Sequence, residues 1–202
     1  DIAPTLVLNW DEPEQNLRTV GQAVNRSEQV DQILVGSEQQ IAAARETFAP
    51  LVDDHPKLLL LRATQLSTIY LVSNQPGLCS SLIQDLGFEL VSFPGSSAAA
   101  ADSLLSPISL ETLPQLNAAD SVILLGSNAS QIQQFDTVDK FEEHQLSALQ
   151  QAWEANAIAQ SLDASKARRV YFISAYLCAG LPGPIGTELY LEELKQQLLP
   201  SD

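Results

Sequence analysis

The sequence of 202 residues has no methionine, two cysteines, two histidines and only ten basic side chains. Two cysteines, Cys79 and Cys178, are too few for a disulfide framework. Buried free thiols are the commoner state for such residues, and a bond between them in an oxidising compartment is the open alternative. His55 and His144 lie far apart in the sequence and beside no cysteine, so we expect no zinc or transition-metal site built from this chain alone. A metal, if one is involved, should arrive already held by another molecule.

Basic residues are scarce, because ten Lys and Arg stand against 25 Asp and Glu, for a formal net charge of −15. Nucleic-acid binding requires a basic stripe that displaces counterions from phosphates, and an anionic membrane surface repels an acidic chain. Nucleic acid is therefore excluded as a partner, and an anionic membrane surface is disfavoured. No apolar run approaches the roughly 20 residues that span a bilayer. Since the chain begins at Asp1 without a methionine, we expect it to be processed, trimmed or part of a longer protein.

The clearest periodic pattern is a seam with 4-3-4-3-4 spacing, which predicts a long amphipathic helix over residues 25–50. The seam comprises Val30, Leu34, Ser37, Ile41, Ala44 and Phe48. Asn25 and Glu28 predict a capping box at its start, and Pro50 is expected to end it. A shorter helix is predicted over residues 16–24, after an extended segment over residues 2–10.

From residue 57 onward, short apolar segments alternate with helical patterns, which predicts a mainly parallel sheet covered by helices on both faces. The expected strands are 57–61, 69–72, 88–93, 121–125 and 170–174, and the expected helices are 75–86, 109–113, 137–162 and 184–199. The predicted fold class is therefore α/β, a three-layer α/β/α unit with about five strands, preceded by a long helix. Three parts are expected: 1–24 from the end of another unit, 25–50 as the helix, and 51–202 as the α/β unit.

Ligands of open parallel sheets meet the loops at the carboxyl ends of the strands. The side chains expected there offer hydrogen bonds and an aromatic face, which suit the holding of a ligand. They are Arg62, Ser73, Asn74, Ser127, Asn128 and Tyr176. Because no acid–base pair, activated nucleophile or phosphate loop is among them, we predict no catalytic residue.

Several of these candidates have a plainer interpretation. Ser73 and Asn74 could simply cap the helix that follows them. Arg62 suits either a ligand anion or an ordinary surface ion pair, and Tyr176 suits either a ligand platform or packing at the rim.

Four stretches, in the same order along the chain, resemble the binding proteins that serve ABC importers of iron–siderophore complexes, haem and vitamin B12. The first combines IAPTLV at 2–7 with NLRTVGQA at 16–23, and the second is IAAAR at 41–45. The third combines SPISLETL at 106–113 with ADSVIL at 119–124, and the fourth combines RVYFI at 169–173 with GPIGTEL at 183–189. The family has two α/β lobes joined by one long helix, and this chain is similar to the end of the first lobe, the helix and the second lobe.

The resemblance implies a protein without catalysis that captures a ferric siderophore and delivers it to an ABC importer permease. Iron is then expected only as a siderophore chelate, with no resident cofactor. The implied location is periplasmic or extracytoplasmic, with the signal segment outside this chain and the membrane reached only through a lipid anchor or a partner. Glu111 stands where the family's second lobe carries a docking glutamate, although a helix-surface glutamate without a partner is the plainer interpretation. A corrinoid or haem cargo, or a small α/β enzyme of unknown reaction, are the alternatives.

Overall fold

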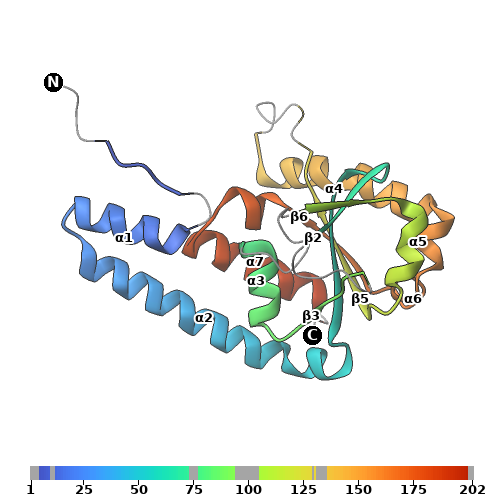
Figure 1. Cartoon of the computed structure of the whole chain (residues 1–202), viewed down its shortest axis with the longest axis horizontal. Helices are drawn as coiled ribbons and strands as arrows, with labels where there is room; N and C mark the ends of the chain where they lie inside the picture. Colours follow the sequence, from blue (N-terminus) through green and yellow to red (C-terminus); the bar gives the residue numbers. More distant parts are fainter. Residues whose placement is uncertain are drawn as a thin grey trace.

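The computed structural model describes residues 5–9, 12–72, 77–93, 105–128, 130 and 136–199. Within them, a six-stranded sheet lies between two helical layers (Figure 1). One face of the sheet packs against α2 (Ser27–Asp54), α3 (Leu78–Asp85) and α7 (Pro184–Leu198). The other face packs against η2 (Leu110–Leu116), α4 (Val138–Ala155), α5 (Ala157–Ser161) and α6 (Asp163–Lys166). The predicted three-layer α/β fold is confirmed.

The sheet is parallel at its centre and carries one reversed strand. Its order is β4-β2-β1-β5-β6, and β3 pairs with the start of β1. The strands are β1 (Lys57–Gln65), β2 (Thr68–Val72), β3 (Glu89–Leu90), β4 (Leu105–Ile108), β5 (Ser121–Gly126) and β6 (Val170–Ser174). β2 runs antiparallel to β1 and to β4, whereas β3 and β5 run parallel to β1, and β6 runs parallel to β5. The alternation of strands with helices therefore begins only after β2, since β1 turns directly into β2.

The apolar runs of the sequence form the two central strands. All six residues of β5 are buried, and Leu58 to Leu61 of β1 are completely inaccessible to solvent. Leu58 and Leu60 pack into the core beneath α2, α3 and α7, while Leu59 and Leu61 pack into the core beneath α4 and α5. This alternation follows from the two-residue period of a strand, and it decides which face each later residue of β1 occupies.

α1 (Pro13–Ala23) folds back on α2 as a helical hairpin, which extends to one side of the sheet (Figure 1). The two helices touch where Gly21 meets Val30, since a Cβ at position 21 would collide with the valine side chain. Arg18 of α1 forms an ion pair with Asp31 of α2. The predicted seam of α2 is confirmed at its buried positions, which are Val30, Leu34, Ala44 and Phe48.

Both predicted ends of the long helix are wrong. No capping box forms, because Asn25 lies in the turn between the helices with a φ of 57° and Arg26 occupies the N-cap. Pro50 does not end α2, which continues to Asp54. A proline inside a helix costs about 3 kcal/mol. Here Leu51 and Val52 in the last turn pack against the core, and their burial offsets that cost.

Other boundaries also differ from the sequence-based expectations. The third strand is only the two residues of β3, β4 was not expected, and the helix expected over 137–162 breaks at Asn156. Residues 5–9 form no strand, and the rest of the extended segment expected over 2–10 lies outside the described residues. Within α7, the apolar side chains of Ile185 and Leu189 are 72% and 39% exposed.

Candidate functional site

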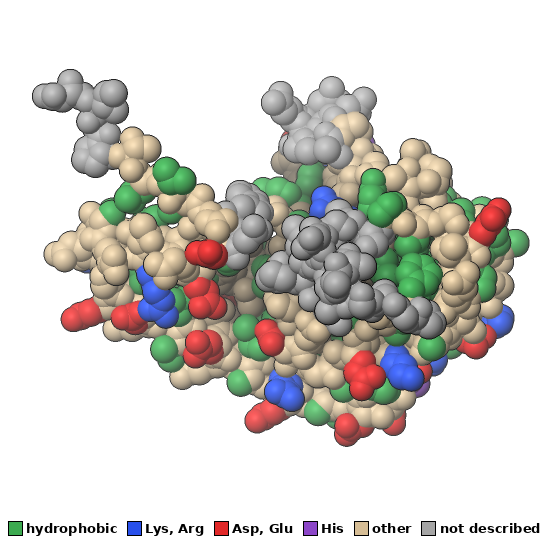
Figure 2. All heavy atoms as spheres, in the orientation of Figure 1, with side chains coloured by type: hydrophobic (Ala, Val, Ile, Leu, Met, Phe, Trp, Pro, Cys, Tyr) green, Lys and Arg blue, Asp and Glu red, His purple; other side chains and the backbone are tan. Residues whose placement is uncertain are grey.

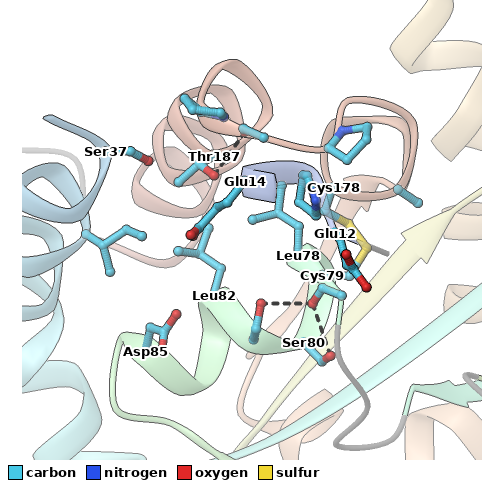
Figure 3. Close-up of a pocket in the computed structure, with 18 of the residues that line it drawn as sticks. Glu12, Glu14, Ser37, Leu78, Cys79, Ser80, Leu82, Asp85, Cys178 and Thr187 are labelled. Atoms are coloured by element: carbon cyan, nitrogen blue, oxygen red, sulfur yellow. Dashed lines mark hydrogen bonds between the residues drawn. A yellow bond between two sulfur atoms is a disulfide. The ribbon is translucent and has the colours of Figure 1, made fainter. Parts of the chain in front are cut away.

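A cleft of about 1020 Å³ opens between the α1–α2 hairpin and the helices α3 and α7 (Figure 3). One wall is the hairpin, and the opposite wall is built from the first turns of α3 and α7 together with η4 (Tyr176–Gly180), a short π-helical segment after β6. The floor is one end of the sheet face covered by α2, α3 and α7, where the buried side chains of Val72 and Leu125 lie. The volume of the cleft is at the upper end of the range for small-molecule sites.

Arg62 supplies the cationic group on this floor. It follows Leu58 and Leu60 at two-residue steps on β1, so its side chain leaves the sheet on the face covered by α2, α3 and α7. Arg62 is half-buried and pairs through its backbone with Tyr70 and Leu125. None of the ion pairs found among the described residues includes it. A guanidinium in this setting offers five donors to a ligand's oxygen atoms.

The sequence interpretation placed Arg62 in a loop at the end of a strand, and that placement is wrong. β1 continues through Arg62 to Gln65 because Thr64 and Gln65 still belong to the hairpin with β2. The residue nevertheless lines the cleft.

A disulfide joins α3 and η4, which are two of the three elements of the wall opposite the hairpin. Cys79 in the first turn of α3 and Cys178 in η4 are bonded, with their Cα atoms 4.8 Å apart (Figure 3). Both cysteines line the cleft. The expectation of free buried thiols is therefore wrong, because the packing of α3 against η4 brings together two cysteines that are 99 residues apart in sequence. The hydroxyl of Tyr190, which is fully buried in α7, donates to the backbone carbonyl of Cys79 at 3.4 Å and fixes the same turn.

The first turns of α3 and α7 both begin at the cleft and both follow a glycine with a left-handed backbone. Gly77 has a φ of 155° and Gly183 a φ of 113°. The hydroxyl of Ser81 donates back to the carbonyl of Gly77 at 2.9 Å, and that of Thr187 donates to the carbonyl of Gly183 at 3.1 Å. These side-chain contacts hold the turns in place.

Carboxylates line the hairpin side of the cleft. Glu14 in the first turn of α1 and Glu38 of α2 are exposed there, together with Glu12 just ahead of α1. Asp85 at the end of α3 lies across the opening from Glu14 (Figure 3). Partial burial raises the pKa of Asp85 above its ordinary value, and the charge of Arg45 opposes that rise. The space-filling view likewise shows acidic side chains gathered over α1 and α2 (Figure 2).

Ser127 and Asn128 lie at the end of β5, outside the residues that line the cleft. Gln145 of α4 holds Asn128 by a pair of backbone contacts: its Oε1 accepts from the Asn128 amide at 2.7 Å and its Nε2 donates to the carbonyl at 2.6 Å. The hydroxyl of Thr64 donates to the carbonyl of Ser127 at 2.7 Å. These contacts tie the end of β5 to α4 and β1.

Tyr176 lies at the start of η4 and is half exposed. Its ring packs edge-on against Phe141 of α4, with 5.4 Å between the ring centres. Because β5 and β6 are parallel neighbours, Tyr176, Ser127 and Asn128 share the carboxyl edge of the sheet as expected. Their roles as ligand contacts stay predictions.

Ser73 and Asn74 lie outside the described residues. They follow β2, which runs opposite to β5 and β6, so that strand does not end at the same edge of the sheet. Glu111 is exposed in the first turn of η2, three residues after β4 ends.

The sequence interpretation missed the hairpin side of the cleft, which includes Glu14, Arg18 and Glu38. One signal was present: Leu34, Glu38 and Ile41 lie within two turns of one another on the predicted helix, so they share a face. What the sequence did not indicate is that α1 folds back beside that face. Within the described residues, no group of three or more His, Cys, Asp or Glu is placed to hold a metal ion.

Comparisons with known proteins agree with this architecture. A family model described as "periplasmic binding protein" matches residues 1–177. A search of curated proteins gives no match.

Several solved structures share the fold. One is a periplasmic binding protein component of a ferrichrome ABC transporter from Bacillus subtilis, with a TM-score of 0.71 and 20% identity, over 99% of this chain and 69% of that one. Another is the triscatecholate siderophore-binding protein FeuA of Bacillus subtilis with ferri-bacillibactin, with a TM-score of 0.64 and 20% identity, over 95% and 62%. A third is FhuD2 of Staphylococcus aureus with bound ferrioxamine B, with a TM-score of 0.68 and 14% identity, over 96% and 68%. This chain thus spans roughly two thirds of each of these neighbours.

Proposed function

Because this chain belongs to the periplasmic binding protein family, we propose that it is part of an extracytoplasmic solute-binding protein that captures a ferric siderophore and delivers it to an ABC-type permease. The neighbours in the solved structures support the cargo class, since their own descriptions name ferrichrome, ferri-bacillibactin and ferrioxamine B. Iron enters as part of this cargo, bound by the chelator's oxygen atoms.

The observation that carries the proposal is the position of Arg62 on the floor of the cleft. A half-buried guanidinium without an acidic partner among the described residues retains its donors for a ligand. Hydroxamate, catecholate and carboxylate chelators surround their iron with oxygen atoms, which are acceptors for those donors. The cleft volume of about 1020 Å³ has room for a molecule of that size.

A binding role is also favoured by how the cleft is lined. Apolar residues such as Leu34, Val72, Leu78 and Leu125 surround the single arginine of the floor. Apolar walls with a few polar anchors are typical of small-molecule binding sites, in which 70–90% of the ligand surface is buried. Such a lining selects a ligand by shape and by a few directed contacts.

We further propose that residues 1–24 are the end of a first lobe, 25–50 part of the connecting helix, and 51–202 the second lobe. The chain covers 62–69% of the length of the three neighbours, which leaves room in them for another lobe. Exposed apolar side chains on the hairpin support this division, because a first lobe packed there would bury them. They are Val24, Ile33 and Val35, which are 47–59% exposed. Closure of a first lobe over the cleft would bury the cargo on both sides.

The location outside the cytoplasm is supported by the disulfide, because such bonds form and persist in oxidising compartments. No helix in the described part of the chain is long and apolar enough to cross a membrane. Contact with the membrane would then be made through the permease or through a lipid anchor.

Glu111 is the residue we propose for docking on the permease. It is exposed on a short helix, so its carboxylate is solvated before docking and free to form a bidentate pair with an arginine afterwards. The resemblance of SPISLETL to the family's second lobe supports this role, because a docking glutamate is expected at that position.

The test is a binding titration of the full-length protein with ferrichrome, ferrioxamine B and ferri-bacillibactin, monitored by calorimetry. We expect saturable 1:1 binding of at least one chelate. Arg62→Gln should weaken it about 10–100-fold, the value of one or two charge-assisted hydrogen bonds. The matched control is Arg168→Gln, since Arg168 is exposed and away from the cleft. Absence of saturable binding, or equal affinity in the Arg62 variant, would refute the proposal.

A further inference from the structure

The strand β6 forms an open edge of the sheet. It stands last in the order β4-β2-β1-β5-β6, and β5 is its one partner among the described strands. The amide of Val122 in β5 donates to the carbonyl of Arg169, so the backbone groups of Tyr171 also face β5. Since the backbone groups of successive residues point to opposite sides of a strand, those of Val170 and Phe172 face away from β5. No described residue forms a hydrogen bond with them.

This edge lacks the features that usually prevent a strand from pairing with another chain. Edge strands of native proteins commonly carry a proline, a lysine or another charge, or a bulge. The strand at the opposite edge, β4, contains Pro107. The sequence of β6, VYFIS, has neither proline nor charge, and its register with β5 is unbroken. An open edge of this kind can accept an added strand.

A groove of about 400 Å³ lies beside this edge, and β6 and α4 line most of it. Val170 and Phe172 of β6 and Leu146 and Trp153 of α4 give it an apolar lining. The two β6 residues therefore turn their side chains toward the groove and their backbone groups toward the open edge. An added strand would place every second side chain in the groove. The groove shares no lining residue with the cargo cleft, so we expect binding at the two places to be independent.

The groove has a cationic group at the amino end of β6. Arg168 lines it, is exposed, and forms no ion pair within the described part of the chain. The acidic residue of the lining, Glu154, accepts a hydrogen bond from Nε2 of Gln150 at 3.2 Å. The guanidinium of Arg168 therefore retains its donors for a carboxylate from outside the chain.

We infer that the β6 edge binds an extended segment of another protein, which adds to the sheet as an antiparallel strand, places alternate apolar side chains in the groove and pairs an acidic side chain with Arg168. Antiparallel pairing is the more stable arrangement, and it brings the carboxyl-terminal part of the segment to the amino end of β6. A second copy of this chain fits less well, because two molecules with a formal net charge of −15 each repel one another.

The test is a fluorescence anisotropy titration of the full-length protein with the peptide TVTVTVTD, labelled at its amino end and amidated at its carboxyl end. In the antiparallel arrangement its valines face the groove and direct their backbone groups to β6, while its aspartate lies opposite Arg168. Two isomers carry N-methyl groups on the second and third valines or on the second and third threonines, which removes donors on the β6 side or on the solvent side.

The charge is tested with a peptide that ends in asparagine and with the variant Arg168→Gln. The matched control is Arg26→Gln, because Arg26 is exposed at the start of α2 and does not line the groove.

We expect saturable 1:1 binding that methylation of the threonines leaves unchanged and methylation of the valines weakens at least about tenfold, through the loss of two hydrogen bonds. Arg168→Gln should weaken binding of the aspartate peptide about three- to tenfold and leave the asparagine peptide unaffected, while Arg26→Gln should behave as wild type. Absence of saturable binding, or equal effects of the two methylation patterns, would overturn the inference. A dimer of the protein alone that the peptide dissociates would also overturn it, since a second copy would then occupy the edge.

Discussion

The disulfide between Cys79 and Cys178 offers a prediction with a calculable size. Its removal, by reduction or by the double variant Cys79→Ala, Cys178→Ala, frees the first turn of α3 from η4. The hydrogen bond from the Tyr190 hydroxyl of α7 to the backbone carbonyl of residue 79 would be kept, but it does not connect α3 to η4. Cys178 is 3% exposed, so alanine is preferable to serine, which would bury a hydroxyl group.

The magnitude follows from the length of chain that the bond closes. The cysteines are 99 residues apart, and the chain-entropy model assigns about 4.7 kcal/mol to a loop of roughly 100 residues. Native disulfides typically contribute about 2–5 kcal/mol. For a protein of this size, each kcal/mol shifts the midpoint of thermal unfolding by about 2–4 °C. We therefore expect the midpoint to fall by roughly 5–20 °C.

Thermal unfolding followed by circular dichroism, with and without a phosphine reductant, measures this loss. Reduced wild type and the double variant should unfold at similar temperatures, and the reductant should not affect the variant. Cargo affinity should also weaken in both, since both cysteines line the cleft. Two titratable thiols in the untreated protein would show that the bond is absent. An unchanged midpoint after verified reduction would refute the loop-closure reasoning.

The remaining predictions use other parts of the molecule. Gly36→Ala in the middle of α2 should raise the free energy of unfolding by about 0.5–1 kcal/mol, because an added Cβ meets nothing within 4 Å. Gly186→Ala should lower the free energy of unfolding, because its Cβ would collide with the carbonyl of Leu181. Chemical denaturation of the two variants measures both effects. Glu111→Ala should leave cargo affinity unchanged and weaken permease binding by about 2–5 kcal/mol, as measured by a pull-down with the transporter. Equal recovery of wild type and variant in the pull-down would assign Glu111 another role. Because burial raises the pKa of Asp85 above its ordinary 3.8, its ionisation is less favourable in the folded protein than in the unfolded one. Asp85→Asn should therefore raise the unfolding midpoint at pH 7, and the gain should disappear as pH falls below 3.8; a gain that is the same at all pH values would contradict the cause.

The sequence predicted the elements whose patterns are long or strongly apolar. The 4-3-4 seam of α2 is buried at Leu34 and Phe48, and the run that forms β5 is buried throughout. A helix buried on one face and a strand buried on both faces each show a characteristic pattern of apolar residues within their own segment. Such a pattern can be recognised without knowing the rest of the fold. The three-layer fold could therefore be predicted.

The features that the sequence did not reveal depend on contacts between distant segments. The turn at Leu66 and Ser67 has no glycine or asparagine, so the β1–β2 hairpin carried no turn signature, and Arg62 was placed in a loop. The pairing of Cys79 with Cys178 depends on how α3 packs against η4, which neither segment's own pattern indicates. The acidic side of the cleft arises only when α1 folds back on α2.

The most direct test of the central claim is native mass spectrometry of the full-length protein purified from its own iron-limited host, combined with metal analysis and an absorption spectrum. The account predicts a 1:1 adduct whose mass equals one iron plus one siderophore, with the charge-transfer absorption of a ferric chelate. Loss of this adduct in Arg62→Gln, with its retention in Arg168→Gln, would place it in the cleft. A corrinoid or haem spectrum, or an iron-free protein that takes up no ferric chelate when one is added, would contradict the account.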